Sequence, residues 1–95
     1  MAFSLENKVK VYGKSQVINN EPLAPQTLKK IKEAEVVDGT YGLSVCFTYI
    51  SGNASYLPVD KQMLNQPSVG DKVDPKKVRV LTLEKGGLES YVVTW

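Results

Sequence analysis

The stretch of residues 36–50 combines a turn with a strict alternation of large and small side chains. From 41 to 49 the odd positions carry large apolar or aromatic residues, and the even positions carry Gly, Ser, Cys and Thr. This period of two predicts a β-strand with its bulk on one face. Just before it, Asp38-Gly39 favours a two-residue type I′ turn. That turn would set Val36 opposite Tyr41, so that the apolar faces of two antiparallel strands agree.

Two further turns predict more hairpins. Gly52-Asn53 predicts a turn that sets Tyr49 opposite Tyr56 and completes a three-stranded meander over about residues 33–59. Gly86-Gly87 predicts a last hairpin over residues 76–95. Its register pairs Leu83 with Ser90, Leu81 with Val92, Val80 with Val93 and Val78 with Trp95, and it sets Glu84 against Glu89 in an unfavourable pairing. Both faces of this hairpin are apolar, so at least one strand must be covered on both sides or meet a partner.

The remaining stretches predict short elements. Residues 5–18 alternate as a first strand, and Asn19–Pro22 has the composition of a turn. Residues 25–32 can form a short helix that begins at Pro25, and residues 60–65 a capped helical turn. About six or seven strands and one or two short helices result. We therefore expect an all-β (β-dominated) single domain over residues 1–95, folded as a small antiparallel barrel, because closure removes exposed strand edges.

The composition argues against catalysis. The chain has 95 residues, 42% of them hydrophobic, which suffices for one modest core. It has no histidine and a single cysteine, so an internal disulfide and the usual zinc, haem and general-base chemistries are not expected. No glycine-rich phosphate loop and no metal-ligand spacing occurs. We expect no catalytic residues, no metal, no cofactor and no enzyme activity, and Cys46 is better explained as a small apolar filler than as a reactive thiol.

The charges are spread unevenly, although the net charge is only +2. Residues 1–32 carry six lysines and two glutamates, residues 33–71 one lysine and five acidic groups, and residues 72–95 five basic and three acidic groups. Two basic ends therefore flank an acidic middle. The first residues show no signal-peptide pattern, and no stretch approaches the ~20 apolar residues that span a bilayer, so we expect a reducing, cytoplasmic location.

The outer face of the predicted first strand is a candidate binding surface. It carries Lys8, Lys10, Tyr12 and Lys14. Ammonium groups suit phosphates and a tyrosine ring suits a stacked base, which favours a nucleic-acid strand as the partner. The alternative is a solvated edge, where lysines prevent edge-to-edge aggregation. The sequence leaves both interpretations open.

Three stretches carry a resemblance to a known family. They are Lys8-Val9-Lys10-Val11-Tyr12, the central strand with its aromatic residues, and the step from Val69-Gly70-Asp71-Lys72-Val73 into Val78-Arg79-Val80-Leu81. Together they resemble the small barrel (OB-like) single-stranded DNA-binding proteins of phages and plasmids, although the helix here precedes the second strand instead of following the third. The resemblance implies sequence-independent binding of single-stranded DNA by lysines and stacked aromatic rings, usually in a homodimer. The nucleic-acid-binding candidates are then Lys8, Lys10, Tyr12, Lys14, Tyr49, Tyr56, Lys76, Lys77 and Arg79.

Two alternatives stay open beside this interpretation. Tyr49 shares the parity of the core residues of its strand, so core packing with the hydroxyl at the rim competes with base stacking. The second alternative is a protein–protein interaction module, or a small viral or mobile-element accessory protein, that docks through its C-terminal hairpin. Tyr91, Val93 and Trp95 would form that interface, with another protein or with a second copy, because Tyr and Trp are enriched in interface hot spots. Core burial would explain the same residues.

Overall fold

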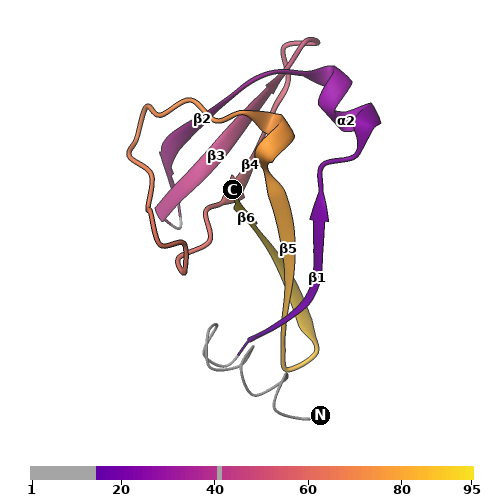
Figure 1. The fold of residues 1–95 in the computed structure, drawn as a ribbon, viewed down its shortest axis with the longest axis vertical. Helices are drawn as coiled ribbons and strands as arrows, with labels where there is room; N and C mark the ends of the chain where they lie inside the picture. The colour runs from indigo at the N-terminus through magenta and orange to yellow at the C-terminus, as the bar shows by residue number, and fades with distance from the viewer. Residues whose placement is uncertain (1–14, 41) are drawn as a thin grey trace.

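Two antiparallel three-stranded sheets make up the fold (Figure 1). The structure, a computed structural model, describes residues 15–40 and 42–95. The elements follow the order β1 (Gln16–Pro22), α2 (Pro25–Lys30), β2 (Ile31–Gly39), β3 (Gly42–Tyr49), β4 (Ala54–Pro58), the 3-10 helix η1 (Pro75–Lys77), β5 (Arg79–Lys85) and β6 (Leu88–Thr94). One sheet has the order β1-β5-β6 and the other β2-β3-β4. The predicted all-β class is therefore confirmed.

The sheets do not close into the predicted barrel. They meet where Val59 forms a parallel bridge with Val93 and the Asp60 amide donates to the Val93 carbonyl at 2.8 Å. On the other side the chain passes from β1 to β2 through α2, and among the described residues no strand pairing joins these two strands. The edge strand β1 has a register shift near its start and a proline at its end, and both features protect an unpaired edge without closure.

The outer edge of β2 is covered by a loop segment. The Val36 amide donates to the Asp71 carbonyl at 2.8 Å, and the Gly70 amide donates to the Val36 carbonyl at 2.8 Å. The Val73 amide donates to the Ala34 carbonyl at 3.0 Å. These bonds satisfy backbone groups that would otherwise form a template for aggregation.

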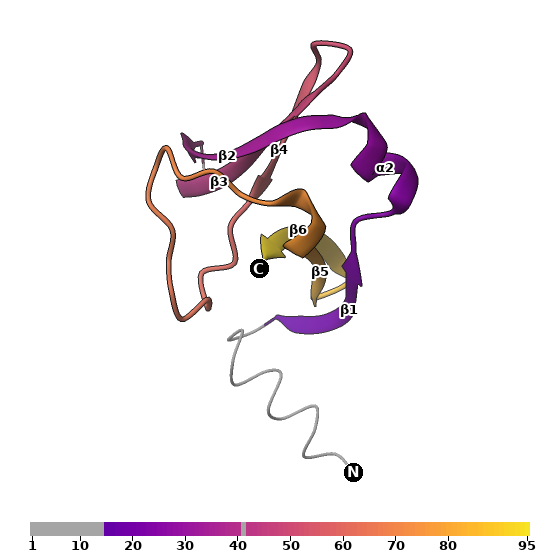
Figure 2. The same cartoon turned by 45° about the horizontal axis from the view of Figure 1, so that its top comes forward.

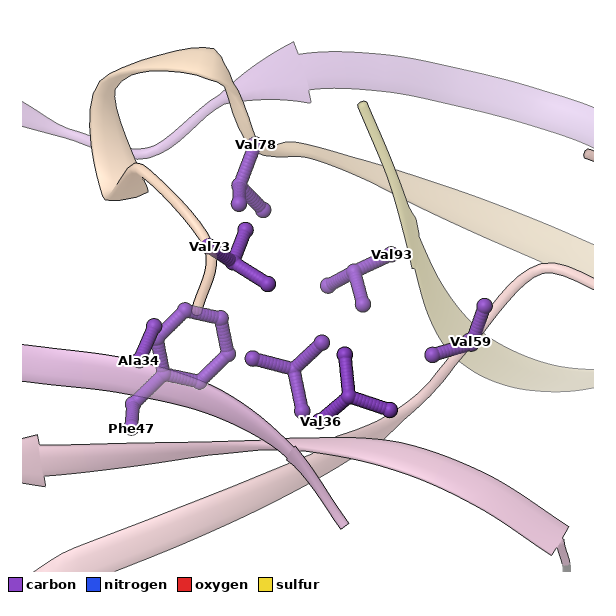
Figure 3. Packing of buried hydrophobic residues seen from close by; sticks show 8 residues of the cluster. Ala34, Val36, Phe47, Val59, Val73, Val78 and Val93 are labelled. Atoms are coloured by element: carbon purple, nitrogen blue, oxygen red, sulfur yellow. The ribbon is translucent and has the colours of Figure 1, made fainter. Parts of the chain in front are cut away.

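The core lies between the two sheets (Figure 3). In the close-up, Val73, Val78 and Val93 point into the same space as Val36. Val36 pairs with Val45, and both are fully buried, as the alternation along the chain predicts. The buried cluster consists of Ala34, Val36, Val45, Phe47, Val59, Val73, Val78 and Val93.

The first turn differs from the prediction by two positions. Gly39 pairs with Gly42 and Asp38 with Leu43, so the chain reverses after Gly39 and not at Asp38-Gly39. Gly42 has a φ of 104°, which supplies the left-handed conformation that the reversal needs. Gly39 is constrained for a different reason, because a Cβ there would lie 2.6 Å from the Ser44 Oγ and 3.2 Å from the Gly42 carbonyl oxygen, so the Ser44 side chain would have to move. The shift is even, so the predicted apolar and polar faces are kept.

The second turn also differs, with a larger effect. Tyr56 pairs with Cys46 and not with Tyr49, so the predicted opposition of the two tyrosines is wrong. The cause is a longer loop, in which the Tyr49 amide donates to the Asn53 carbonyl at 2.8 Å and the Gly52 amide donates to the Tyr49 carbonyl at 2.9 Å. The register changes by an odd number of residues, so Tyr49 and Tyr56 lie on opposite faces of the sheet.

One local prediction was wrong and another is confirmed only in part. Residues 19–22 belong to β1 instead of a turn, because they pair with Arg79–Thr82 of β5. Residues 60–65 form the capped turn but no helix: the Asp60 carboxylate accepts from the Gln62 amide at 2.9 Å, and the Met63 amide donates to the Asp60 carbonyl at 3.3 Å. The part of the predicted first strand before residue 15 lies outside the described residues.

The helix at Pro25 and the last hairpin are confirmed. α2 ends at Lys30, because Ile31 already has an extended conformation and begins β2. In the hairpin, Leu83 pairs with Ser90, Leu81 with Val92 and Val80 with Val93, as predicted. Glu84 does face Glu89, and its Oε2 accepts a hydrogen bond from the Gly87 amide at 2.7 Å. This bond gives the Glu84 carboxylate a partner inside the turn and offsets the repulsion.

Candidate nucleic-acid interface

A hollow of about 660 Å³ lies between α2 and the loop that joins β3 to β4. Both elements sit at the same end of the molecule in Figures 1 and 2. Two lysines and one tyrosine are among the residues that line the hollow, and no acidic residue is among the described residues that line it. The lining residues are Thr27, Lys29, Lys30, Tyr49, Ile50, Ser51 and Asn53.

Backbone hydrogen bonds hold the two walls of this hollow together. α2 starts with a proline in its first turn, and the Leu28 amide donates to the Ala24 carbonyl at 2.9 Å. Lys29 and Lys30 occupy the last turn, where positive charge interacts favourably with the helix dipole. The Ile50 amide then donates to the Lys30 carbonyl at 2.8 Å. This bond ties the β3–β4 loop to the end of the helix and places both lysines beside the loop.

Tyr49 belongs to the core and to the hollow at once. Its side chain is partly buried and packs against the core cluster, and its hydroxyl forms a hydrogen bond of 2.7 Å with the Ser55 Oγ. The same residue lines the hollow. Core packing and ligand contact are thus compatible for this tyrosine, because the hydrogen bond and the core contacts fix the ring in place.

The other predicted basic residues lie on and after η1. Lys76 and Lys77 are exposed, and the Asp74 carboxylate accepts from the Lys76 amide at 3.0 Å. The guanidinium of Arg79 binds Asn20 of β1, with Nε donating to Oδ1 at 2.6 Å and a terminal nitrogen donating to the backbone carbonyl at 3.2 Å. Arg79 therefore helps to hold β1 against β5. Four further candidates, Lys8, Lys10, Tyr12 and Lys14, lie outside the described residues.

Tyr56 lies in a different electrostatic environment from Tyr49. It is 62% exposed on the outer face of the β2-β3-β4 sheet, where a hydrogen bond with Cys46 is the main cause that raises the pKa of Tyr56. On the same face Lys72 forms ion pairs with Glu35 at 3.1 Å and Glu33 at 3.4 Å. The hydrogen bond from Lys72 to Glu35 is the main cause that raises the pKa of Lys72. These carboxylates make the face unfavourable for phosphate groups.

The candidates that lie within residues 15–40 and 42–95 do not gather at one place. The sequence shows the basic pair Lys29-Lys30, but only the bond to Ile50 reveals its position beside Tyr49. Ser51 and Asn53 were not candidates, because a turn sequence carries no sign of what faces it. Of the predicted interface residues, Val93 is fully buried in the core, whereas Tyr91 is 48% and Trp95 38% exposed.

Residues 15–40 and 42–95 also bear on metal binding and membrane insertion. No group of three or more metal-ligating side chains occurs among them. No helix in this part of the chain is long and apolar enough to cross a membrane. In comparisons with known proteins, no family model, no characterised protein and no solved structure matches this chain significantly.

Proposed function

We propose that this protein binds single-stranded nucleic acid, with DNA as the first candidate, without sequence specificity. The observation that carries the proposal is the hollow lined by Lys29, Lys30 and Tyr49 without a carboxylate. Lysines neutralise phosphates and release counterions, which supplies affinity for any sequence. A tyrosine ring stacks on any base, because every base has a π-face.

One nucleotide fits the chemistry of the hollow. The ammonium groups of Lys29 and Lys30 would bind the phosphate, and Tyr49 would contact the base. Thr27, Ser51 and Asn53 line the same space, and their hydroxyl and amide groups suit phosphate or sugar oxygens. η1 lies at the same end of the molecule as α2 in Figure 1, so Lys76 and Lys77 would extend the contact along the strand. Lys8, Lys10, Tyr12 and Lys14 stay candidates from the sequence.

The proposal describes a binding protein and not an enzyme. We place the protein in the cytoplasm as part of this proposal, because Cys46 has no partner cysteine in the sequence with which to form an internal disulfide. Dimerisation stays a prediction from the resemblance to phage and plasmid single-stranded DNA-binding proteins.

The test is fluorescence anisotropy of a labelled oligothymidine of roughly 20 nucleotides, titrated at several salt concentrations. Lys29→Glu/Lys30→Glu should weaken binding at least tenfold. It should also reduce the slope of log K against log salt by about 1.4, because each lost contact with a single strand contributes about 0.7. The matched control is Lys61→Glu/Lys85→Glu, which changes the net charge equally on exposed lysines elsewhere. Equal losses in both variants, or no binding by the wild type at low salt, would refute the proposed site.

A further inference from the structure

One edge of β6 carries unpaired backbone groups. β6 pairs with β5 along its whole length. On its other side, among the described residues, the only contact of this kind is the bridge from Val59 to Val93 near the end of the strand. Residues 88–92 therefore have no strand beside them within residues 15–40 and 42–95. An edge of this kind is a template for the addition of another strand.

The orientation of the groups on this edge follows from the Val93 carbonyl. It accepts from the Asp60 amide and so points away from β5. In an antiparallel pair the residues alternate between those whose backbone groups face the partner strand and those whose groups face away. The amide and carbonyl groups of Glu89 and Tyr91 therefore also point away from β5, toward the open edge. An added strand would bond to these two residues.

The two sheet faces beside this edge differ in chemistry. On one face a hollow of about 330 Å³ lies next to Ser90, between Leu83, Val92 and residues 58–62; Asp60, Lys61 and Gln62 of that segment also line it. The small Ser90 side chain leaves room there for an apolar group. On the other face Glu89 lies beside Glu84, with which it pairs, and it lines a second hollow together with Glu21. Among the described residues that line this second hollow, none is basic.

We propose that the open edge of β6 docks an extended strand of a partner protein that places a basic side chain opposite Glu89 and an apolar side chain opposite Ser90. Side chains of successive strand residues alternate between the faces. Such a partner strand therefore has a basic residue opposite Glu89, an apolar residue opposite Ser90 and a basic residue opposite Tyr91. The first basic group would pair with Glu89, and the second would lie against the ring of Tyr91.

A second copy of this chain fits the edge poorly. A two-fold pairing centred on Glu89 sets that residue opposite its own copy, and like charges directly opposite each other are destabilising. A pairing centred on Ser90 sets Glu89 opposite Tyr91 of the other copy, so the carboxylate gains no basic partner. A pairing centred on Tyr91 places the second copy beside Val93, where Val59 already bridges the edge. The charge and the occupied end of the strand thus favour a basic strand from another protein.

The experiment uses the full chain and two blocked synthetic peptides, one alternating Lys and Val and one alternating Glu and Val. The lysine peptide should bind at least tenfold more tightly than the glutamate peptide, with slower hydrogen exchange of the Tyr91 amide in the complex. Glu89→Lys should reverse this preference. Asp38→Lys, which makes the same charge change on the other sheet, should leave the preference unchanged.

A backbone variant tests the edge itself. Tyr91→Pro removes an amide that faces the open edge and not β5, a position where strands tolerate proline. It should abolish peptide binding while circular dichroism and the melting temperature report a folded chain. Several results would overturn the proposal: equal binding of both peptides, a preference that Glu89→Lys does not reverse, or binding that survives Tyr91→Pro. A dimer in sizing experiments with the Tyr91 amide protected would also overturn it, in favour of a second copy.

Discussion

The hydroxyl and the ring of Tyr49 should make separable contributions to stability and to binding. The hydroxyl bonds the Ser55 Oγ at 2.7 Å, and the ring packs on the core and lines the hollow. Tyr49→Phe removes only the hydroxyl, so it should lower the free energy of unfolding by about 1 kcal/mol, the usual net value of one hydrogen bond. Because the ring stays, oligonucleotide affinity should be unchanged. Tyr49→Ala removes both, and the lost stack should weaken binding by about 5- to 150-fold, equivalent to ~1–3 kcal/mol.

A double-mutant cycle with Ser55→Ala isolates the hydrogen bond. If the two hydroxyl groups stabilise the fold mainly through each other, Tyr49→Phe/Ser55→Ala should cost about as much as either single change, with a coupling energy of about 1 kcal/mol. Urea unfolding gives the stabilities and fluorescence anisotropy gives the affinities, at one salt concentration. Additive single effects would refute the assigned hydrogen bond. A loss of affinity in Tyr49→Phe equal to that in Tyr49→Ala would refute stacking on the ring.

Two further changes probe the β2-β3-β4 sheet. Lys72→Met removes the ion pairs with Glu33 and Glu35. The hydrogen bond to Glu35 raises the pKa of Lys72 in the folded state. The ion pairs therefore stabilise the fold fully below the unfolded-state pKa of ~10.4, and this stabilisation disappears as the pH rises through the higher folded-state pKa. The difference in urea midpoint between wild type and Lys72→Met should therefore shrink above about pH 10.4, and a constant difference up to about pH 11 would contradict the ion pairs. Gly39→Ala should destabilise the fold by ~1–3 kcal/mol, because the added methyl group overpacks against Ser44. A second change, Ser44→Gly, should restore part of this lost stability in thermal unfolding. If Ser44→Gly restores none of it, the contact with Ser44 is not the cause.

Alternation along a strand predicted which side chains are buried, but turns decided which of them meet. Val45 and Phe47 are in the core as their parity requires, and the two-position error in the first turn did not matter because an even shift keeps the faces. In the second turn the register differs from the prediction by an odd number of residues. Tyr56 therefore lies on the opposite face of the sheet from Tyr49, although the prediction set the two opposite each other. Loop length was the missing information, since Gly52-Asn53 suits a two-residue turn as well as the longer loop that forms.

Long-range pairings were harder to predict from the sequence. Asn19–Pro22 reads as a turn locally, yet it continues β1 because β5, about sixty residues later, offers a strand to pair with and Arg79 binds Asn20. The hollow likewise depends on the bond between the Lys30 carbonyl and the Ile50 amide. Neither contact has a signature within its own segment, since tertiary pairing overrides local propensity there.

The two proposed sites should act independently of each other. β5 runs from the end of η1 to the hairpin turn over seven residues, which spans about 20 Å at ~3.3 Å per residue. Figure 1 shows α2 and the β3–β4 loop near the first end of this strand and the hairpin turn at the other. Charges on exposed groups are largely screened beyond ~8 Å at physiological ionic strength. Glu89 therefore contributes little to the potential at Lys29 and Lys30. The hollow beside these lysines and the hairpin face that carries Glu84 and Glu89 can thus take partners of opposite charge on one small chain.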